Sequence, residues 1–447
     1  MKLFNTLSSE IEEFKPIRED KVTLYTCGPT VYDMPHIGNL RALLTYDLLK
    51  RSLAWEGYKV LHAMNLTDVD DKTIKRSEGE KESLKELTKL YEDKVWQDEK
   101  ELNIIKPEII TRPTEYIDKM AGFVESLLAK DYAYKAEDGS IYFSIEKFEN
   151  YGQLSKLAKQ ELKSGARVAQ DEYDKENPAD FVLWKAWTEK DGEIFWETSL
   201  GKGRPGWHLE CSVMAGDTLG DTIDIHAGGV DLVFPHHENE IAQSEAETGK
   251  KFVNFWVHNE HLLVDGKKMS KSLNNFFTLE DIKVKGFDPL DFRYFVLGAH
   301  YRTRLNFTWE GLEAARNARL RVTRLASKTE EVGEINKIYI KKFTAKISDD
   351  LNTPEALAVL WELVRDENVS DADKIATIAQ MDEVLGLGLP NEKAEEVPAE
   401  ITKLVEERKT ARHAKDFAKS DELRDRILGL GWQIEDIEGN NYKIIKK

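Results

Sequence analysis

The sequence is poor in cysteine and has no long apolar run. Its 447 residues contain two cysteines, Cys27 and Cys211, which excludes a disulfide framework and is typical of the reducing cytoplasm. No apolar stretch approaches the ~18 residues of a membrane helix, so we expect no membrane association. The first residues become charged by Glu10, so we expect no secretory signal and a cytoplasmic location.

Acidic residues outnumber basic residues. There are 82 Asp and Glu against 64 Lys and Arg, a net charge of −18, which argues against broad coating of nucleic acid. Two segments are locally basic. Residues 302–328 hold seven Lys and Arg against two Glu, and residues 401–447 hold 11 basic against 9 acidic side chains. Any nucleic-acid contact is expected there.

The first 66 residues predict a β-α-β unit. Residues 21–27 have the alternating pattern of a short strand. After Pro35, leucines recur with helical spacing to Leu53, and Gly57 stands where a helix C-cap is expected. Residues 59–66 predict a second strand. Two strands joined by a helix imply a parallel sheet, so we predict an α/β fold with a Rossmann-like catalytic domain.

The rest of the chain predicts an insertion and then helices. Residues 72–130 have a charged helical pattern, and an inserted module follows, with a polar loop at 156–180. A turn is expected at Asp265 and Gly266, and helices from Trp309 onward. Ser420 is a plausible N-cap near the C-terminus. Further strands are expected at residues 140–145, 222–226 and 252–258, and a hairpin turn at 439–441.

Three clusters of residues could carry chemistry, and the first is His36-Ile37-Gly38-Asn39. It lies between a predicted strand and the start of a helix, where free N–H groups attract anions. Gly38 lets a ligand approach the backbone, because it has no Cβ. The alternative is a loop histidine at an ordinary helix start.

The second cluster is a lysine-rich loop at residues 266–272. Mobile lysines beside small hydroxyl residues suit a triphosphate, whose transition state needs positive charge. A solvated basic loop is the alternative. The lysines and serines are Lys267, Lys268, Ser270, Lys271 and Ser272.

The third cluster has the donor types of a metal site. His236 and Glu240 are four residues apart, on one face if the segment is helical. With Cys27 and Cys211 they offer two thiolates, an imidazole and a carboxylate, a plausible tetrahedral zinc set. Spacing alone does not bring the two cysteines together, and two inert buried cysteines remain the alternative.

Together these clusters resemble the class I aminoacyl-tRNA synthetases. Residues 36–39 are similar to that family's HIGH signature, and residues 268–272 match its KMSKS signature in full. Four segments narrow the resemblance to the cysteinyl-tRNA synthetases: residues 25–32, 65–72, 203–211 and 226–240. Residues 350–355 and 414–421 are further family-like stretches, so the resemblance covers essentially the whole chain.

The resemblance implies a two-step reaction. Cysteine attacks the α-phosphate of ATP to give cysteinyl adenylate and pyrophosphate, and the cysteine then passes to the terminal ribose of cysteine tRNA. Mg²⁺ is expected with ATP, and the chain is expected to be a monomer. The implied ATP-binding residues are His36, Gly38, Asn39 and Lys271; the implied catalytic residues are His36, Asn39, Lys268 and Lys271.

The resemblance also implies one zinc ion per chain, which selects cysteine against serine. Serine is nearly isosteric with cysteine, and a hydrophobic pocket could not reject it by the roughly 10⁴-fold that translation needs. A soft thiolate binds zinc far better than an alcohol does. The implied zinc ligands are Cys27, Cys211, His236 and Glu240, and the implied substrate contacts are Trp207, Thr67 and Asp231.

One position departs from the family pattern, because Asn39 stands where the HIGH signature ends in histidine. Asparagine still donates a hydrogen bond, but it carries no proton charge. An acid role at Asn39 is therefore excluded, and we do not interpret the change as a loss of activity.

The resemblance divides the chain into parts, of which the C-terminal third would meet the tRNA. The arginines of residues 302–328 could contact it or form a solvated helix face. Trp432 could stack on an anticodon base or belong to a core. The expected parts are a Rossmann domain in two halves (1–115 and 201–265), an inserted connective module (116–200), the KMSKS loop and stem-contact region (266–310), a helical anticodon-binding bundle (311–395) and a small C-terminal α/β module (396–447).

Three other functions are alternatives to aminoacylation of cysteine tRNA. A cysteine ligase of the mycothiol type shares the catalytic half but is expected to lack the tRNA-binding tail. A non-catalytic tRNA-binding paralogue usually loses a signature lysine or a metal ligand, and this chain keeps both. A generic zinc-binding protein with a nucleotide-binding fold does not explain the KMSKS match at residues 268–272.

Overall fold

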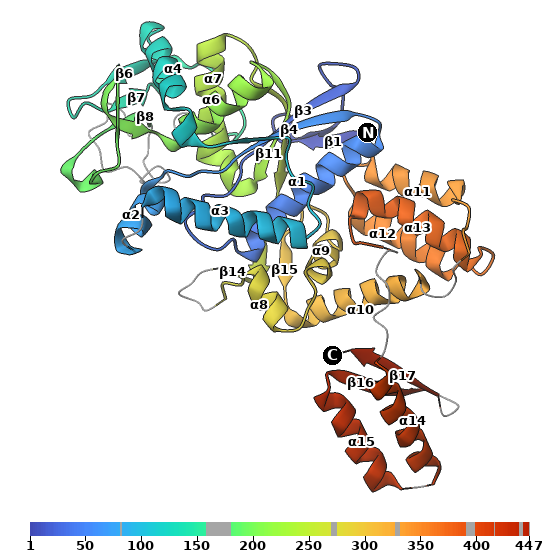
Figure 1. Cartoon of the computed structure of the whole chain (residues 1–447). Coiled ribbons are helices and arrows are strands. Elements are labelled where there is room, and N and C mark those ends of the chain that lie inside the picture. The colour runs from blue at the N-terminus through green and yellow to red at the C-terminus, as the bar shows by residue number, and fades with distance from the viewer. Residues whose placement is uncertain are drawn as a thin grey trace.

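The centre of the molecule is a parallel five-stranded sheet in the order β12-β11-β3-β4-β5, shown in Figure 1. The computed structural model describes residues 1–80, 83–157, 180–269, 275–326, 331–389, 398–414, 416–437 and 441–446. All four strand pairs are parallel, which confirms the Rossmann-like α/β prediction. The strands are β3 (Lys21–Thr26), β4 (Lys59–Asn65), β5 (Ile109–Thr111), β11 (Ile223–Gly229) and β12 (Val253–Asn259).

Helices cover both faces of this sheet. Neighbouring residues on a strand point to opposite faces, so Leu24 and Met64 pack in one core with α1 (Ile37–Trp55), whereas Tyr25 and Ala63 pack in the other with α6 (Trp207–Leu219). Both faces are therefore apolar, as a parallel sheet requires.

The strand order reverses beside β3. The chain adds β4 and β5 on one side of β3, and later adds β11 and β12 on the other. The carboxyl ends of β3 and β11 therefore open a crevice, the place where open α/β sheets bind ligands. Cys27 follows β3 directly and Gly229 ends β11, so the candidate residues are placed at this crevice.

The local predictions for the β-α-β unit are confirmed. The strands begin where the alternation begins, and Gly57 follows α1 at φ +96°, a conformation that favours glycine. Within residues 72–130 the helical prediction is wrong for β5, because three residues are too few to show a period of two. Helices do occupy most of that range: α2 (Asp71–Glu80), α3 (Leu84–Glu101) and α4 (Ile117–Ala129).

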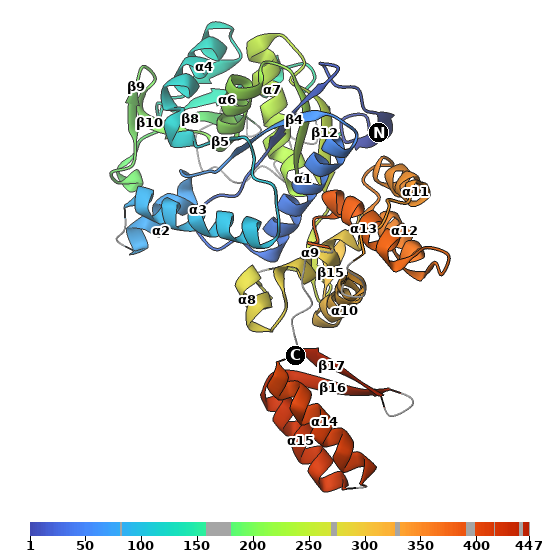
Figure 2. The ribbon, with the colours of Figure 1, turned by 45° about the vertical axis from the view of Figure 1, so that its right-hand side comes forward.

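An antiparallel sheet is inserted between the two halves of the parallel sheet. Its order is β6-β7-β8-β10-β9, and Figure 2 shows it beside α4 and α6. The strand predicted at residues 140–145 is β7; most of the polar loop predicted at 156–180 lies outside the described residues. The strands are β6 (Ala133–Lys135), β7 (Ile141–Phe143), β8 (Phe181–Ala186), β9 (Trp196–Thr198) and β10 (Gly201–Pro205).

The chain then forms a small sheet and helices. Asp265 and Gly266 have positive φ values and turn β13 (Leu262–Val264) into β14 (Lys267–Lys268), as predicted. The third strand, β15 (Leu305–Phe307), is parallel to β13. The helices are α7 (Glu238–Thr248), α8 (Leu279–Val284), α9 (Pro289–Leu297), α10 (Trp309–Ala326), α11 (Lys337–Ile347), α12 (Thr353–Arg365) and α13 (Asp371–Leu385).

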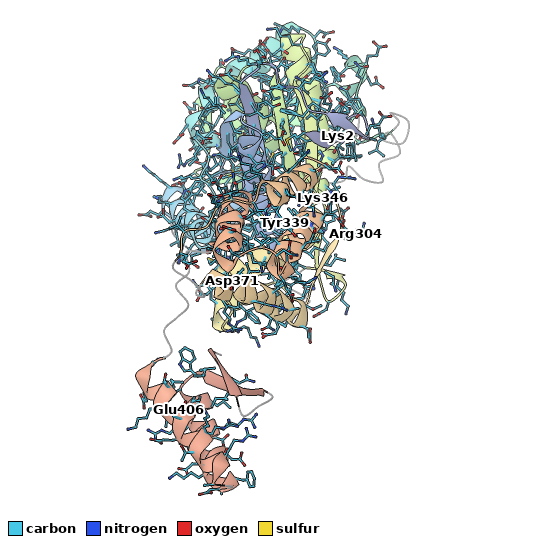
Figure 3. The ribbon with its side chains drawn as sticks, turned by 90° about the vertical axis from the view of Figure 1, so that its right-hand side faces the viewer. Lys2, Arg304, Tyr339, Lys346, Asp371 and Glu406 are labelled. Carbon is cyan, nitrogen blue, oxygen red and sulfur yellow. The ribbon has the colours of Figure 1, made fainter. Side chains whose placement is uncertain are left out.

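The N-terminal strand β1 (Lys2–Asn5) joins the sheet to the helical bundle. The Trp256 N–H donates to Asn5 Oδ1 (3.1 Å), which fixes β1 against β12. On the other side the Phe4 N–H donates to Asp350 Oδ1 (2.8 Å) between α11 and α12. Figure 3 looks onto the face with Lys2 and α11. β1 pairs along its length with β2 (Glu10–Glu13).

The C-terminal module has a core of its own and stands away from the bundle in Figures 1 and 2. The prediction of Ser420 as an N-cap is wrong. α15 begins at Phe417 and is capped by Asp416, whose side chain accepts from the Lys419 N–H, so Ser420 is buried in the first turn. The predicted turn at 439–441 falls largely outside the described residues. The elements are α14 (Ala399–His413), α15 (Phe417–Gly429), β16 (Trp432–Ile437) and β17 (Asn441–Lys446).

Glu99 on α3 predicts a pH dependence of folding. It is 3% exposed, and its Oε2 has no hydrogen-bond partner among the described residues. Burial, with Asp47 nearby, raises the pKa of Glu99 to about 8. Because the folded state keeps a proton that the unfolded state releases above its pKa of about 4.3, this group makes stability fall as pH rises from about 4 through 8.

We therefore expect Glu99→Gln to stabilise the protein at pH 8.5, by about 2 kcal/mol, and to change little at pH 5. Denaturant unfolding at the two pH values measures this. Glu125→Gln, an exposed change on α4, is the control. An equal pH dependence in Glu99→Gln and wild type would contradict the argument.

Candidate functional site

The fold brings the four proposed metal donors together. Cys27 follows β3, Cys211 lies on α6, His236 lies in the kinked segment Val233–His237 before α7, and Glu240 lies on α7. One donor atom from each lies within 4.8 Å of the other three. The two sulfurs are 3.8 Å apart, although 184 positions separate them in sequence. Sequence spacing alone did not settle whether the two cysteines meet, and the structure places them side by side.

The position of the His236 imidazole suits a metal ligand. Its Nδ1 lies 2.9 Å from His208 Nδ1, so the ring is held by that nitrogen. Its Nε2 is buried without a hydrogen-bond partner among the described residues, 3.0 Å from Glu240 Oε1. Two potential ligand atoms that lie this close without a hydrogen bond between them fit two ligands of one metal ion. The Trp207 ring stacks on the imidazole, with centroids 4.1 Å apart.

The electrostatics of the cluster also favour a cation. Burial lowers the pKa of His236, but the facing Glu240 carboxylate outweighs burial and raises it to about 10. Burial raises the pKa of Glu240, but His226 and His236 outweigh burial and lower it to about 2. Burial also raises the pKa of the Cys27 thiol. A metal ion would supply the positive charge that this buried carboxylate needs and would displace the thiol protons.

Sequence reasoning missed a second set of donors beneath the first. Cys27 and Glu240 form it with His226 and His237. His237 Nε2 lies 3.4 Å from Cys27 Sγ, and His226 Nε2 lies 2.9 Å from Glu240 Oε2. Both rings are fully buried. The two histidines of this set line neither large cavity, whereas Cys27, which both sets share, lines an open cavity with Trp207. His226 follows a strand period rather than a ligand spacing, so no local pattern indicates it.

The three residues proposed to contact the substrate differ in how far they are exposed to the crevice. Trp207 is 40% exposed, and with Asp231 it lines both large cavities of the crevice. Thr67 is 1% exposed. Its hydroxyl accepts from Asn65 Nδ2 (3.1 Å) and approaches Glu210 Oε2 (3.5 Å), and it lines neither cavity. Thr67 is therefore placed in the wall behind the crevice, next to Asn65 and Glu210.

The HIGH-like residues begin helix α1. His36 is the N-cap: its Nδ1 accepts from the Asn39 N–H (3.1 Å), and the His36 N–H donates to Asn39 Oδ1 (3.2 Å). Both side chains line a cavity of about 420 Å³ that also contains Cys27 and Lys268. The start of α1 and the metal donor Cys27 thus border one space, although the Ile37 N–H already donates to the Phe277 carbonyl oxygen (2.9 Å).

The space at Gly38 is limited by packing as well as by the expected ligand. A Cβ at this position would lie 2.9 Å from the His36 ring and 2.7 Å from Met269 Cε. Glycine is therefore needed for the packing of the ring and of the lysine-rich loop, in addition to ligand access. Lys268 ends β14 beside this cavity, whereas Lys271 lies outside the described residues.

The expected tRNA-facing arginines are largely engaged within the protein. Arg319 is 3% exposed and pairs with Asp291 (2.8 Å), so its expected surface role is wrong. Arg302 pairs with Asp350 (2.6 Å). Arg304 remains 70% exposed at its side chain, beside Glu260.

The aromatic residue expected to stack on tRNA also needs correction. Trp432 is 7% exposed in the core of the C-terminal module, so the core alternative is the right one. Phe417, at the start of α15, is 64% exposed. Sequence reasoning missed it, although it lies inside the family-like segment 414–421.

Comparison with known proteins identifies the family. Residues 13–317 match the model for the catalytic domain of class I (C) tRNA synthetases, and residues 342–389 match the DALR domain. The cysteine–tRNA ligase of Chlamydia muridarum is 47% identical in a 464-residue alignment that covers 97% of each chain. The chain belongs to the cysteinyl-tRNA synthetase family. The cysteine–tRNA ligase of Brachyspira hyodysenteriae is 46% identical, again over 97% of each chain.

Solved structures of other synthetases share the fold of this cysteinyl-tRNA synthetase family member. A methionyl-tRNA synthetase from Mycobacterium tuberculosis aligns with a TM-score of 0.57 at 14% identity, over 82% of this chain and 90% of that one. A LeuRS from Agrobacterium radiobacter aligns with a TM-score of 0.58 at 11% identity, over 84% of each chain. These likenesses support the class I architecture alone. Among the described helices, none combines the length and apolar character of a membrane span.

The donor geometry predicts a metal-dependent property. We expect the purified protein to hold one divalent metal ion per chain, and Cys211→Ser to weaken metal binding by at least about 100-fold, because an alcohol replaces a thiolate ligand. Elemental analysis after dialysis measures this. Ser244→Ala on α7, which removes a buried hydroxyl with no partner among the described residues, is the control. One ion per chain in Cys211→Ser would refute the ligand assignment.

Proposed function

We propose that this protein attaches L-cysteine to cysteine tRNA at the expense of ATP. It first forms cysteinyl adenylate and pyrophosphate, and then transfers cysteine to the 3′ end of the tRNA. The observation that carries this proposal is the shared cavity: the metal donor Cys27, the helix start at His36 and Lys268 line one space at the carboxyl edge of the sheet. Family membership agrees with it.

The proposed cofactors are one zinc ion per chain and Mg²⁺ that enters with ATP. Two thiolates, one imidazole and one carboxylate suit tetrahedral zinc. When bound, zinc supplies a soft Lewis acid that prefers a thiolate to an alcohol. The proposed ligands are Cys27, Cys211, His236 and Glu240.

The chain's own residues would position the two small substrates. Trp207 bounds the cysteine pocket, and Asp231 offers a carboxylate to the substrate ammonium group. The positive end of the α1 dipole, with the His36 ring, would hold the ATP phosphates. Lys268 and Lys271 add positive charge toward the β- and γ-phosphates, where a nucleotidyl transfer depends on positioning and charge stabilisation.

The tRNA acceptor end fits the larger cavity of the crevice. That cavity has a volume of about 960 Å³ and extends from Trp207 to the inserted sheet. Lys72 and Lys185 lie in its wall and would meet the phosphate backbone. The chain is proposed to act as a monomer, with the parts and boundaries that the sequence predicted.

The C-terminal module favours tRNA over the amino sugar of a mycothiol-type ligase. It forms a folded unit with a core of its own, which a ligase of a small sugar does not need. Phe417 rather than Trp432 is the aromatic side chain exposed for stacking on an unpaired base.

Substrate selection gives one test. We expect cysteine-dependent ATP–pyrophosphate exchange, and a kcat/KM for serine lower by roughly 10⁴-fold, because a hydroxyl remains protonated and is a poor zinc ligand. Exchange kinetics with each amino acid measure the ratio. Comparable exchange with serine would refute selection by the metal, and no exchange with cysteine would refute the proposed function.

The C-terminal module gives a second test. Phe417→Ala is expected to lower kcat/KM for tRNA by about 10-fold, because base–aromatic stacking contributes about 1–3 kcal/mol, and to leave cysteine-dependent exchange unchanged. Aminoacylation with varied tRNA measures this. Leu428→Ala, a 40% exposed apolar side chain on the same helix, is the matched control. An equal loss in both variants would argue against stacking.

A further inference from the structure

A cavity of about 330 Å³ lies at the amino edge of the parallel sheet. The strands β3, β4 and β11 are parallel, so their amino ends share one edge, opposite to the crevice at their carboxyl ends. Neither the metal donors nor the residues of the two signature motifs line this cavity. Its volume falls within the range of small-molecule pockets, which begins at about 300 Å³. It is therefore a separate candidate site.

Three basic residues line this cavity: Arg18, Lys21 and Lys59. All three are exposed, and within the described ranges none of their side chains has an ion pair or a hydrogen bond. Lys21 and Lys59 are partners in the register of β3 and β4, and like charges directly opposite each other on neighbouring strands repel. The positive charges thus lie together without a carboxylate that neutralises them.

The backbone holds these three residues at the edge of the sheet. The Lys21 N–H donates to the Arg18 carbonyl oxygen (3.2 Å), which closes the loop before β3. The Lys59 N–H donates to the carbonyl oxygen of Asp20 in the same loop (3.0 Å). The loop and the two strands therefore place the three cations beside one another before any ligand is present.

The acidic residues of this edge have other partners. Asp224 also lines the cavity, but it is 2% exposed. Its oxygens accept from the Ile17 N–H (2.5 Å) and from the N–H and hydroxyl of Thr23 (2.8 Å each). Asp221 pairs with Lys250 (2.6 Å) instead. The lining therefore carries an excess of positive charge in a chain whose net charge is −18.

The remaining wall of the cavity is largely apolar. Ile17 and Leu61 are 51% and 38% exposed, so two large aliphatic side chains stay accessible beside the cations. Leu219, at the end of α6, and Val60 of β4 extend this wall. A small hydrated ion would leave the apolar surface in water, whereas a ligand with an apolar body would cover it, which is favourable roughly in proportion to the area.

We propose that this cavity binds an organic phosphate monoester with an apolar body. The phosphate carries a charge close to −2 at neutral pH, which suits three cations better than the single charge of a carboxylate does. The planar guanidinium of Arg18 can donate to two phosphate oxygens, and Lys21 and Lys59 add charge. The body lies against Ile17 and Leu61. This site goes beyond aminoacylation, because it faces away from the crevice.

Calorimetric titration of the full-length protein at pH 7.5 tests this proposal, with hexyl phosphate as the probe. Inorganic phosphate and hexanoate are titrated for comparison. We expect hexyl phosphate to bind at least about tenfold more tightly than inorganic phosphate, because buried CH₂ groups add affinity, and more tightly than hexanoate. Lys21→Gln and Lys59→Gln are each expected to weaken binding of hexyl phosphate by about three- to fivefold, and Leu61→Thr by about threefold.

Lys337→Gln, at an exposed lysine of α11 without an ion pair in the described part of the chain, is the matched control and is expected to bind hexyl phosphate as wild type does. Thermal unfolding of each variant without ligand verifies that it is folded. Unchanged affinity in both Lys21→Gln and Lys59→Gln would overturn the site. Equal affinities for hexyl phosphate and inorganic phosphate would overturn the role of the apolar wall, and tighter binding of hexanoate would overturn the choice of phosphate.

Discussion

The site depends on the parallel pairing of β3 with β11. The two strands are about 200 positions apart in the chain, and Tyr25 pairs with His226 in the shared register. Asp224 helps to fix that register near the amino end, because its carboxylate accepts from the N–H and the hydroxyl of Thr23 (2.8 Å each). A slip by one residue would exchange the two faces of β11. It would move His226 away from Glu240 and separate the donors that the crevice assembles.

A buried group of thiols, histidines and carboxylates is costly unless its charges are compensated. Here Glu240 is fully buried between His226 and His236. The second set of donors is linked to a further histidine, because His237 Nδ1 lies 2.8 Å from His258 Nε2. His237 and His226 thus orient Cys27 and Glu240 of the first set, as partners behind the ligands do in metal sites. A cation bound there would compensate the buried carboxylate.

Sequence reasoning was strongest where one local pattern controls the structure. The β3-α1-β4 unit follows from strand alternation, helical leucine spacing and Gly57, and all are local signals. The candidate metal ligands came from resemblance, and the structure brings the donor atoms of Cys27 and His236 together. Two failures are local: β5 is too short to show a period, and Asp416 rather than Ser420 caps α15. The others are tertiary. Trp432 and Arg319 are polar-tipped or charged side chains whose burial depends on partners elsewhere, such as Asp291.

The same limit explains why a basic segment does not define an interface. Residues 302–328 carry an excess of positive charge, but Arg302 is held by Asp350, and Arg41 of α1 donates to the carbonyl oxygens of His261 (2.6 Å) and Thr303 (2.5 Å). The Arg41 bonds connect α1 with the segments before β13 and β15, and the Arg302 ion pair connects the latter segment with the bundle. Within residues 302–328, Arg302 and Arg319 are thus held by internal carboxylates, whereas Arg304 stays exposed. Net charge along the sequence therefore does not tell which basic side chains reach the surface, and burial by tertiary partners decides it. The C-terminal module, which has a core of its own, exposes Phe417.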